Sequence, residues 1–111
     1  MKIAASFIKS NFDTKTTIEK LENTDIDYIH VDLMDGKFVK NKTFTMNEII
    51  KYLSKTKKNL DVHLMVNNPL KYLEAFATLN TEYFTFHFEA VKDVLETLKK
   101  IKAIYRRRSL L

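Results

Sequence analysis

Cysteine is absent from this chain of 111 residues, and glycine and proline each occur once. The lack of cysteine excludes disulfide scaffolds, thiol nucleophiles and cysteine-ligated zinc or iron–sulfur centres. The single glycine, Gly36, excludes Walker loops and dinucleotide-binding fingerprints, because each of these phosphate-binding loops needs several glycines. With 45% hydrophobic and 30% charged residues, the composition is that of one ordinary folded domain.

Long apolar runs are also missing. No segment approaches the roughly 18 uninterrupted apolar residues that a membrane helix needs. The apolar stretch from Ile3 to Ile8 is too short and too polar for the hydrophobic region of a secretory signal. We therefore expect a cytoplasmic protein that does not associate with membranes.

The formal net charge is +5, but the lysines do not form a stripe. They are scattered among the 14 acidic residues, whereas the arginines are consecutive, from Arg106 to Arg108. We interpret most lysines as a solvated surface and expect no nucleic-acid partner. The abrupt Arg-rich ending predicts a basic tail at residues 105–111, distinct from a domain at residues 1–104.

Strand-like and helix-like segments alternate along the chain. β-Branched and aromatic residues predict strands at Ile3–Ile8, Asp27–Met34, Leu60–Val66 and Tyr83–Phe88. Helical spacing and capping residues predict helices from Asp13 to about Asn23, from the capping box Thr45-Met-Asn-Glu48, from Asn68 as N-cap with Pro69 as first helical residue, and from Val91 to about Ile104.

This order of four β-α units predicts an α/β fold with a parallel sheet and helices outside it. Two architectures fit, an open doubly wound sheet and a segment of a (β/α)8 TIM barrel. A complete barrel usually needs ~250 residues, so the chain would supply at most its first four βα units, a half-barrel.

Two of these strands carry polar side chains at every second position. The second strand reads His30-x-Asp32-x-Met34 and the third reads Asp61-x-His63-x-Met65, so each has one polar and one apolar face. Imidazoles and carboxylates that converge at the C-terminal ends of neighbouring strands indicate a divalent metal site. Ligands without sulfur suit zinc, manganese, iron or cobalt. Asp61 would then orient a ligand from beneath. The alternative is a set of interior histidines satisfied by hydrogen bonds.

Further residues near the expected strand ends have open interpretations. Met34 and Met65 are either core residues or an apolar cushion for a substrate. His87 and Glu89 fit a pocket-lining, a surface or a ligand-supporting position equally well. Gly36 follows Met34-Asp35 and is expected to supply a positive φ in a turn.

Four motifs occur in a characteristic order, namely His30-Val-Asp-Leu-Met-Asp-Gly36, then Phe38-Val39 with Asn41, then Leu60-Asp-Val-His-Leu-Met-Val66 with Asn68-Pro69, and His87-Phe-Glu-Ala90. From about Ile3 to Ile101 the chain resembles the ribulose-phosphate 3-epimerase family. The resemblance implies a TIM barrel that uses one divalent metal ion (Zn, Fe, Mn or Co) to interconvert D-ribulose 5-phosphate and D-xylulose 5-phosphate.

The resemblance also implies residue roles. His30, Asp32 and His63 would be metal ligands, and Asp32 would be one of two catalytic acid/base carboxylates. Ser6 and His63 would contact the sugar-phosphate substrate, and Met34 and Met65 would line its pocket. The residue types suit proton removal at carbon 3, because a metal stabilises the resulting negative charge and reprotonation from the opposite side needs a second acid/base group.

The chain departs from the family pattern in composition and in length. The family usually has Pro where Lys40 stands, Gly-Pro near Thr45-Met46, and Gly in the turns at Asp25 and Asn80. Its second catalytic aspartate and its phosphate-binding loops come from later strands. We therefore expect a truncated N-terminal half, inactive or impaired alone, whose exposed strand edges favour a homo-oligomer. The alternatives are a related epimerase of a hexulose phosphate such as allulose 6-phosphate, and a non-catalytic half-barrel that acts as an interaction module.

Overall fold

The computed structural model describes residues 1–7 and 13–109, with the side chains of residues 106–109 left undescribed. Its strands are β1 (Ala4–Ser6), β2 (Tyr28–Met34), β3 (Asn59–Met65) and β4 (Thr81–Phe86). Its helices are α1 (Thr14–Glu22), α2 (Met46–Leu53), α3 (Leu70–Ala77) and α4 (Val94–Ser109), and a short 3-10 helix, η1 (Phe88–Ala90), follows β4. The alternation of strand and helix confirms the four predicted βα units.

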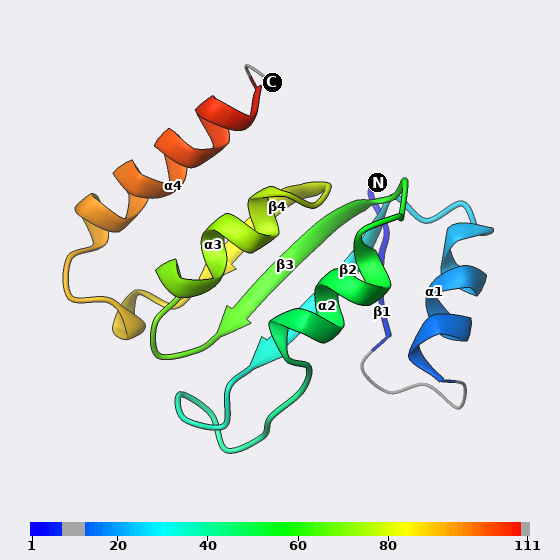
Figure 1. The fold of residues 1–111 in the computed structure, drawn as a ribbon, viewed down its shortest axis with the longest axis horizontal. Coiled ribbons are helices and arrows are strands. Elements are labelled where there is room, and N and C mark those ends of the chain that lie inside the picture. The colour runs from blue at the N-terminus through cyan, green and yellow to red at the C-terminus, as the bar shows by residue number, and fades with distance from the viewer. Residues whose placement is uncertain (8–12, 110–111) are drawn as a thin grey trace.

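The strands form one parallel sheet in the sequential order β1-β2-β3-β4. Figure 1 shows α2 and α3 lying across the same face of this sheet, and each helix packs beside the next one along the chain. A doubly wound sheet would reverse its strand order and carry helices on both faces. The described residues instead have the arrangement of half a TIM barrel, which decides between the two architectures predicted from the sequence.

The hydrophobic core lies between the sheet and these helices. From Ile29 in β2 and Leu60 in β3 onward burial alternates: one row of apolar residues is buried, and the other row, which carries the polar residues and ends in a methionine, is half-buried. The apolar side chains on this side of the sheet are Ile29, Val31, Leu33, Leu60, Val62, Leu64 and Val66, each no more than 1% exposed. Ile49 and Leu53 from α2 and Phe76 from α3 pack on them. The opposite side of the sheet, called the open face below, therefore carries the polar rows.

Two of the predicted helix caps are confirmed. Asp13 Oδ1 accepts a hydrogen bond of 2.8 Å from Thr16 N at the start of α1. In α2, Thr45 and Glu48 form the reciprocal capping box. The third cap is wrong, because α3 begins at Leu70 with Pro69 in the N-cap position and no side-chain cap bond. Asn68 contributes its backbone carbonyl, which accepts from Lys71 N at 3.2 Å.

The first strand, the fourth strand and the last helix differ most from their expected boundaries. The first strand ends at Ser6, and the rest of its predicted range reaches residue 8, which lies outside the described residues. β4 is displaced toward the N-terminus, from 83–88 to Thr81–Phe86, because the chain turns into η1 at His87. The last helix continues beyond Ile104 to Ser109. Arginine is a good helix former, so the Arg-rich segment does not end the helix.

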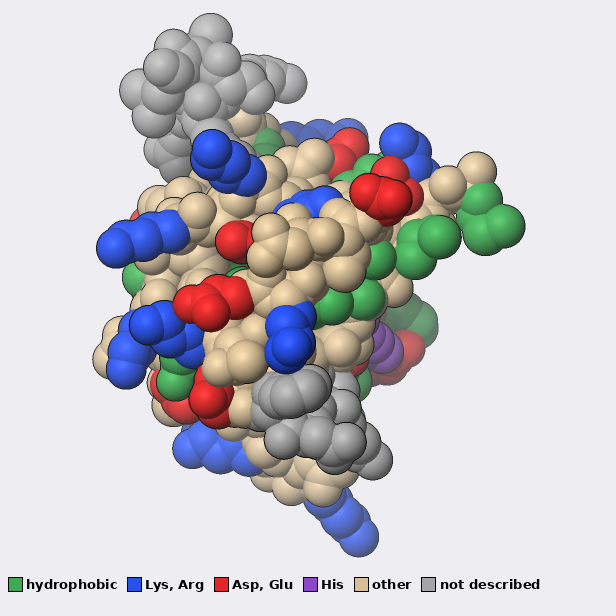
Figure 2. Space-filling view, turned by 90° about the vertical axis from the view of Figure 1, so that its right-hand side faces the viewer, with side chains coloured by type: hydrophobic (Ala, Val, Ile, Leu, Met, Phe, Trp, Pro, Cys, Tyr) green, Lys and Arg blue, Asp and Glu red, His purple; other side chains and the backbone are tan. Residues whose placement is uncertain are grey.

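The surface has the mixed charge expected of a solvated exterior. On the face shown in Figure 2, Lys and Arg side chains are interspersed with Asp and Glu side chains. Across the described residues, no helix has the length and apolarity that crossing a membrane requires.

Candidate metal centre

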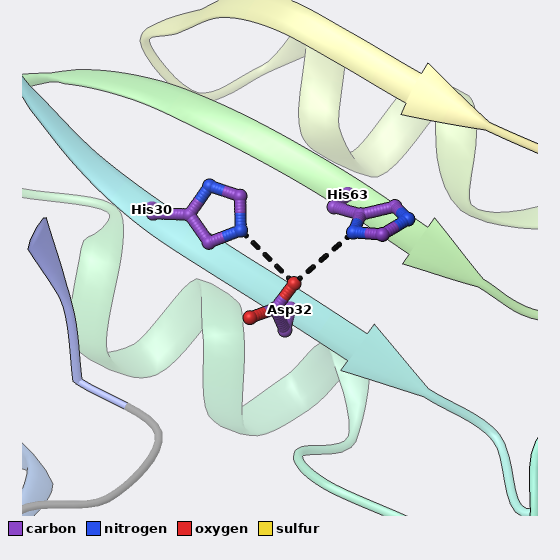
Figure 3. A group of neighbouring side chains, drawn as sticks. All are labelled: His30, Asp32 and His63. Carbon is purple, nitrogen blue, oxygen red and sulfur yellow. Dashed lines mark hydrogen bonds and ion pairs between the residues drawn. The ribbon is translucent and has the colours of Figure 1, made fainter. Parts of the chain in front are cut away.

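Three side chains that the sequence predicts as metal ligands lie together on the open face. His30 and Asp32 come from β2 and His63 comes from β3, and Figure 3 shows them pointing toward one another. His30 Nε2 lies 2.9 Å from Asp32 Oδ1, and His63 Nδ1 lies 3.3 Å from the same oxygen. The strand register brings them together, because Asp32 and His63 are direct partners across β2 and β3.

This donor set fits a divalent metal ion. One ligand atom from each of the three residues lies within 4.8 Å of the others. An ion with bonds of about 2.0–2.2 Å to nitrogen and oxygen brings neighbouring ligand atoms to roughly 3 Å apart, close to the separations observed. The three side chains keep between 19 and 29% of their surface exposed, so an ion can reach them from the open face. His30, Asp32 and His63 could therefore hold a metal, and two imidazoles with a carboxylate do not fix its identity.

Asp61 supports His30 from the next strand, as the sequence predicts. His30 and Asp61 are register partners, and His30 Nδ1 lies 3.0 Å from Asp61 Oδ2. His30 therefore contacts a carboxylate through each ring nitrogen. Burial acts to lower the pKa of His30, but its hydrogen bonds and attraction to Asp61 and Asp32 outweigh burial and hold the pKa above its ordinary value.

The raised pKa of His30 predicts a pH-dependent stability in metal-free protein. A histidine whose folded pKa exceeds its unfolded value of about 6.5 contributes its full stabilisation below that pH and loses it as the pH rises through the folded pKa. We expect the urea midpoint in EDTA to fall between pH 6 and pH 9. The fall should be smaller in His30→Gln, and equal slopes in the two proteins would contradict this assignment.

The β2–α2 loop holds the C-terminal end of β2 in place. Thr43 Oγ1 accepts from Met34 N at 2.9 Å and donates to the Asp32 carbonyl at 3.0 Å. Gly36 has a φ of 77°, which confirms the predicted turn. These contacts fix the backbone that carries Asp32.

Asp35 ties this loop to the loop that follows β3. Its carboxylate accepts from the backbone N–H groups of Lys37 at 2.8 Å, Phe38 at 2.9 Å and Asn67 at 2.9 Å. Burial acts to raise the pKa of Asp35, but these three donors hold the pKa below its ordinary value. The sequence indicates Asp35 only as a turn residue, and the structure adds this link between loops.

The predicted substrate-contacting residues surround the triad on neighbouring strands. Ser6 is the register partner of His30, and Met34 pairs with Met65 at the C-terminal ends of β2 and β3. A nearby cavity of about 680 Å³ is lined by Met34 and Asp35, together with residues of α2 and α3, but not by the triad. The triad lies on the open face, and this cavity lies between the strand ends and the helices.

His87 is the residue whose contact could not be predicted. Its Nε2 lies 2.8 Å from His63 Nε2, although the two residues are 24 positions apart in the chain. The sequence placed His87 and Glu89 only at the end of the fourth strand, and it gave no preference among a pocket-lining, a surface and a ligand-supporting position. The contact depends on where β4 ends, two residues before the predicted end.

The sequence is also similar to that of a known protein family. The sequence matches the family described as ribulose-phosphate 3 epimerase over residues 2–110. The chain belongs to the ribulose-phosphate 3-epimerase family. The resemblance to this family that the sequence motifs indicated is therefore confirmed.

Individual relatives agree with this assignment. The chain is 40% identical to a ribulose-phosphate 3-epimerase of Chlamydia pneumoniae over 84 residues, which cover 76% of the chain and 37% of that protein. It is 36% identical to the Rhodobacter capsulatus enzyme over 104 residues, or 93% of the chain and 46% of that protein. For the Methanocaldococcus jannaschii enzyme the identity is 38% over 106 residues, or 94% and 44%. The chain thus spans somewhat less than half the length of these curated relatives.

Proposed function

We propose that this chain provides the metal-binding half of a ribulose-phosphate 3-epimerase, which interconverts D-ribulose 5-phosphate and D-xylulose 5-phosphate. The observation that carries the proposal is the convergence of His30, Asp32 and His63 at one place on the open face of a family half-barrel. In TIM barrels, catalytic residues come from the C-terminal ends of several strands. Asp32 and His63 lie two residues before the C-terminal ends of β2 and β3, and His30 lies two residues before Asp32.

Each residue has a definite task in this proposal. His30 Nε2, His63 Nδ1 and the Asp32 carboxylate would hold the divalent ion, which acts when bound as a Lewis acid for negative charge on a substrate oxygen. Asp32 also serves as an acid/base group, moving the proton at carbon 3 of the sugar. Asp61 keeps His30 oriented through the 3.0 Å contact to Nδ1.

The substrate contacts extend this arrangement. We assign Ser6 to a polar contact with the sugar phosphate and His63 to a contact through the edge of its ring, because both residues lie on strands that adjoin β2. Met34 and Met65 would provide an apolar wall at the strand ends, where flexible thioether side chains adapt to a ligand.

These residues alone do not supply everything that epimerisation needs. Inversion at carbon 3 requires two acid/base groups on opposite sides of the carbon, and Asp32 is one of them. Asp61, the other carboxylate on β2 or β3 near the triad, is held by His30. Loss of one acid/base group typically lowers a rate by about 10²–10⁴-fold. We therefore expect the 111-residue chain alone to show no turnover above background.

A chimera tests the proposal directly. Residues 1–104 would be joined to the C-terminal remainder of the Methanocaldococcus jannaschii relative, which is 38% identical over the shared region. With divalent metal in a coupled assay, the chimera should epimerise D-ribulose 5-phosphate, and Asp32→Asn should lower the rate by about 10²–10⁴-fold. The intact relative is the positive control. A folded, metal-loaded chimera that is inactive, or one that Asp32→Asn leaves unchanged, would contradict the proposal.

Other parts of the assignment stay predictions. β1 and β4 are the outer strands of the described sheet, so self-association through their edges is proposed, and the mass of the chain in solution tests it.

The coupled epimerase assay of the chimera, repeated with a hexulose 6-phosphate as substrate, distinguishes the related epimerase. The cytoplasmic location and the separate tail at residues 105–111 also stay predictions.

A further inference from the structure

His63 contacts a different partner through each of its ring nitrogens. Nδ1 faces the shared oxygen of Asp32 at 3.3 Å, and Nε2 faces His87 Nε2 at 2.8 Å. The second contact is short enough for a hydrogen bond, so one of the two Nε2 atoms carries a proton and the other accepts it. The position of this proton decides whether the lone pair of His63 Nδ1 is available to bind a metal ion.

Metal binding by His63 requires a single arrangement of protons. An imidazole nitrogen binds a metal through its lone pair, so Nδ1 of His63 must be unprotonated. Neutral His63 then carries its proton on Nε2 and donates it to His87 Nε2. His87 in turn carries its proton on Nδ1, and this atom faces the Glu89 carboxylate at 3.8 Å. With an ion bound between His63 Nδ1 and the Asp32 carboxylate, all four ring nitrogens of the two histidines have compatible neighbours.

The fold holds the His87 ring at this position. β4 ends at Phe86, and His87 occupies the N-cap position of η1, where its carbonyl accepts from Ala90 N at 2.9 Å. The ring of Phe38, from the β2–α2 loop, lies 5.2 Å from the His87 ring, measured between centroids, at an interplanar angle of 37°. The side chain of His87 is 37% exposed, so these contacts, rather than deep burial, restrict it.

We infer that His87 is a positioning residue for the metal site, and that it accepts the Nε2 proton of His63 and so keeps Nδ1 available as a ligand. The inference rests on the proposed function, because it assumes that His63 binds the ion. Each ligating histidine then has a neighbour at its other ring nitrogen: His87 at Nε2 of His63, and Asp61 at Nδ1 of His30. Groups that orient a ligating histidine through its other nitrogen typically contribute 10–100-fold to metal affinity.

Two substitutions separate the hydrogen bond from the ring packing. His87→Phe keeps an aromatic ring against Phe38 but removes the acceptor, whereas His87→Gln removes the ring but keeps a polar group near the position of Nε2. In titrations of the 111-residue chain with Co²⁺, followed by visible absorption, His87→Phe should bind about 10–100-fold more weakly. His87→Gln should stay close to the wild-type affinity. A purely structural role for the ring predicts the reverse order.

A measurement on the unsubstituted chain removes any dependence on how the variants fold. In long-range ¹H–¹⁵N spectra of the Zn²⁺-loaded chain, His63 should have a metal-bound Nδ1 and a protonated Nε2. A metal-bound Nε2, or equal Co²⁺ affinity in His87→Phe and wild type, would overturn the inference while leaving the metal site intact. Failure of the wild-type chain to bind either ion would overturn the proposed metal site itself, and this inference with it.

Discussion

Replacing His63 by alanine is expected to weaken the binding of Zn²⁺ or Co²⁺ by more than about 100-fold. Loss of a group that merely orients a ligand costs 10–100-fold, and His63→Ala removes a ligand atom as well as its support. The remaining donors, His30 Nε2 and Asp32 Oδ1, both lie on β2 and lie 2.9 Å apart. Two ligands from one strand leave the ion bound on one side only.

The matched control for this substitution is Thr85→Ala. Thr85 is the β4 register partner of His63 and is exposed, but it does not belong to the triad. Competition with a chelator of known affinity measures both proteins, and Thr85→Ala should bind as the wild type does. His63→Asn should be intermediate, because an amide oxygen stands near the position of Nδ1. Equal metal retention by His63→Ala and the wild type would remove His63 from the site.

Replacing Phe76 by alanine is expected to remove a large part of the stability of the fold. Phe76 is fully buried, and its ring meets that of Phe84 edge-on, with the centroids 6.3 Å apart. Truncation of a buried phenylalanine costs about 3–5 kcal/mol. A domain of this size is stable by only about 5–15 kcal/mol. The expected fall in Tm is therefore about 15 °C or more.

Phe88 provides the control for this effect. It is 67% exposed, so Phe88→Ala should change the free energy of unfolding by no more than about 0.5 kcal/mol. Urea denaturation followed by circular dichroism, without metal, measures both variants. A Phe76→Ala protein as stable as Phe88→Ala would show that α3 does not pack on the sheet as described.

The fold and the triad could be predicted because both follow from patterns among residues that are close together in the sequence. Alternation in β2 and β3 fixes which side chains face the helices, and two adjacent parallel strands with the same alternation bring their polar rows together. The capping box at Thr45 and Glu48 was equally local. Because the two strands share this alternation, Asp32 and His63 could be expected on the same face of the sheet before their register was known.

The features that could not be predicted depend on distant contacts or on competing local geometries. Asn68 is a good N-cap by type, but Pro69 already has helical dihedral angles with φ −60° and ψ −32°, and no side-chain cap forms. The alternation around Phe86 and Phe88 favours a continued strand, whereas the bond from Ala90 N to the His87 carbonyl closes a turn. The link from His63 to His87 follows from that turn.

The sequential strand order has a consequence for how the chain is made. Each strand pairs with the strand that comes next in the sequence. Register partners such as Ile29 and Leu60, or Leu60 and Thr81, are therefore separated by only about one βα unit. Each pairing can thus form as soon as one further unit leaves the ribosome, without waiting for the end of synthesis. By the time α3 emerges, both strands that carry the triad are already available to pair.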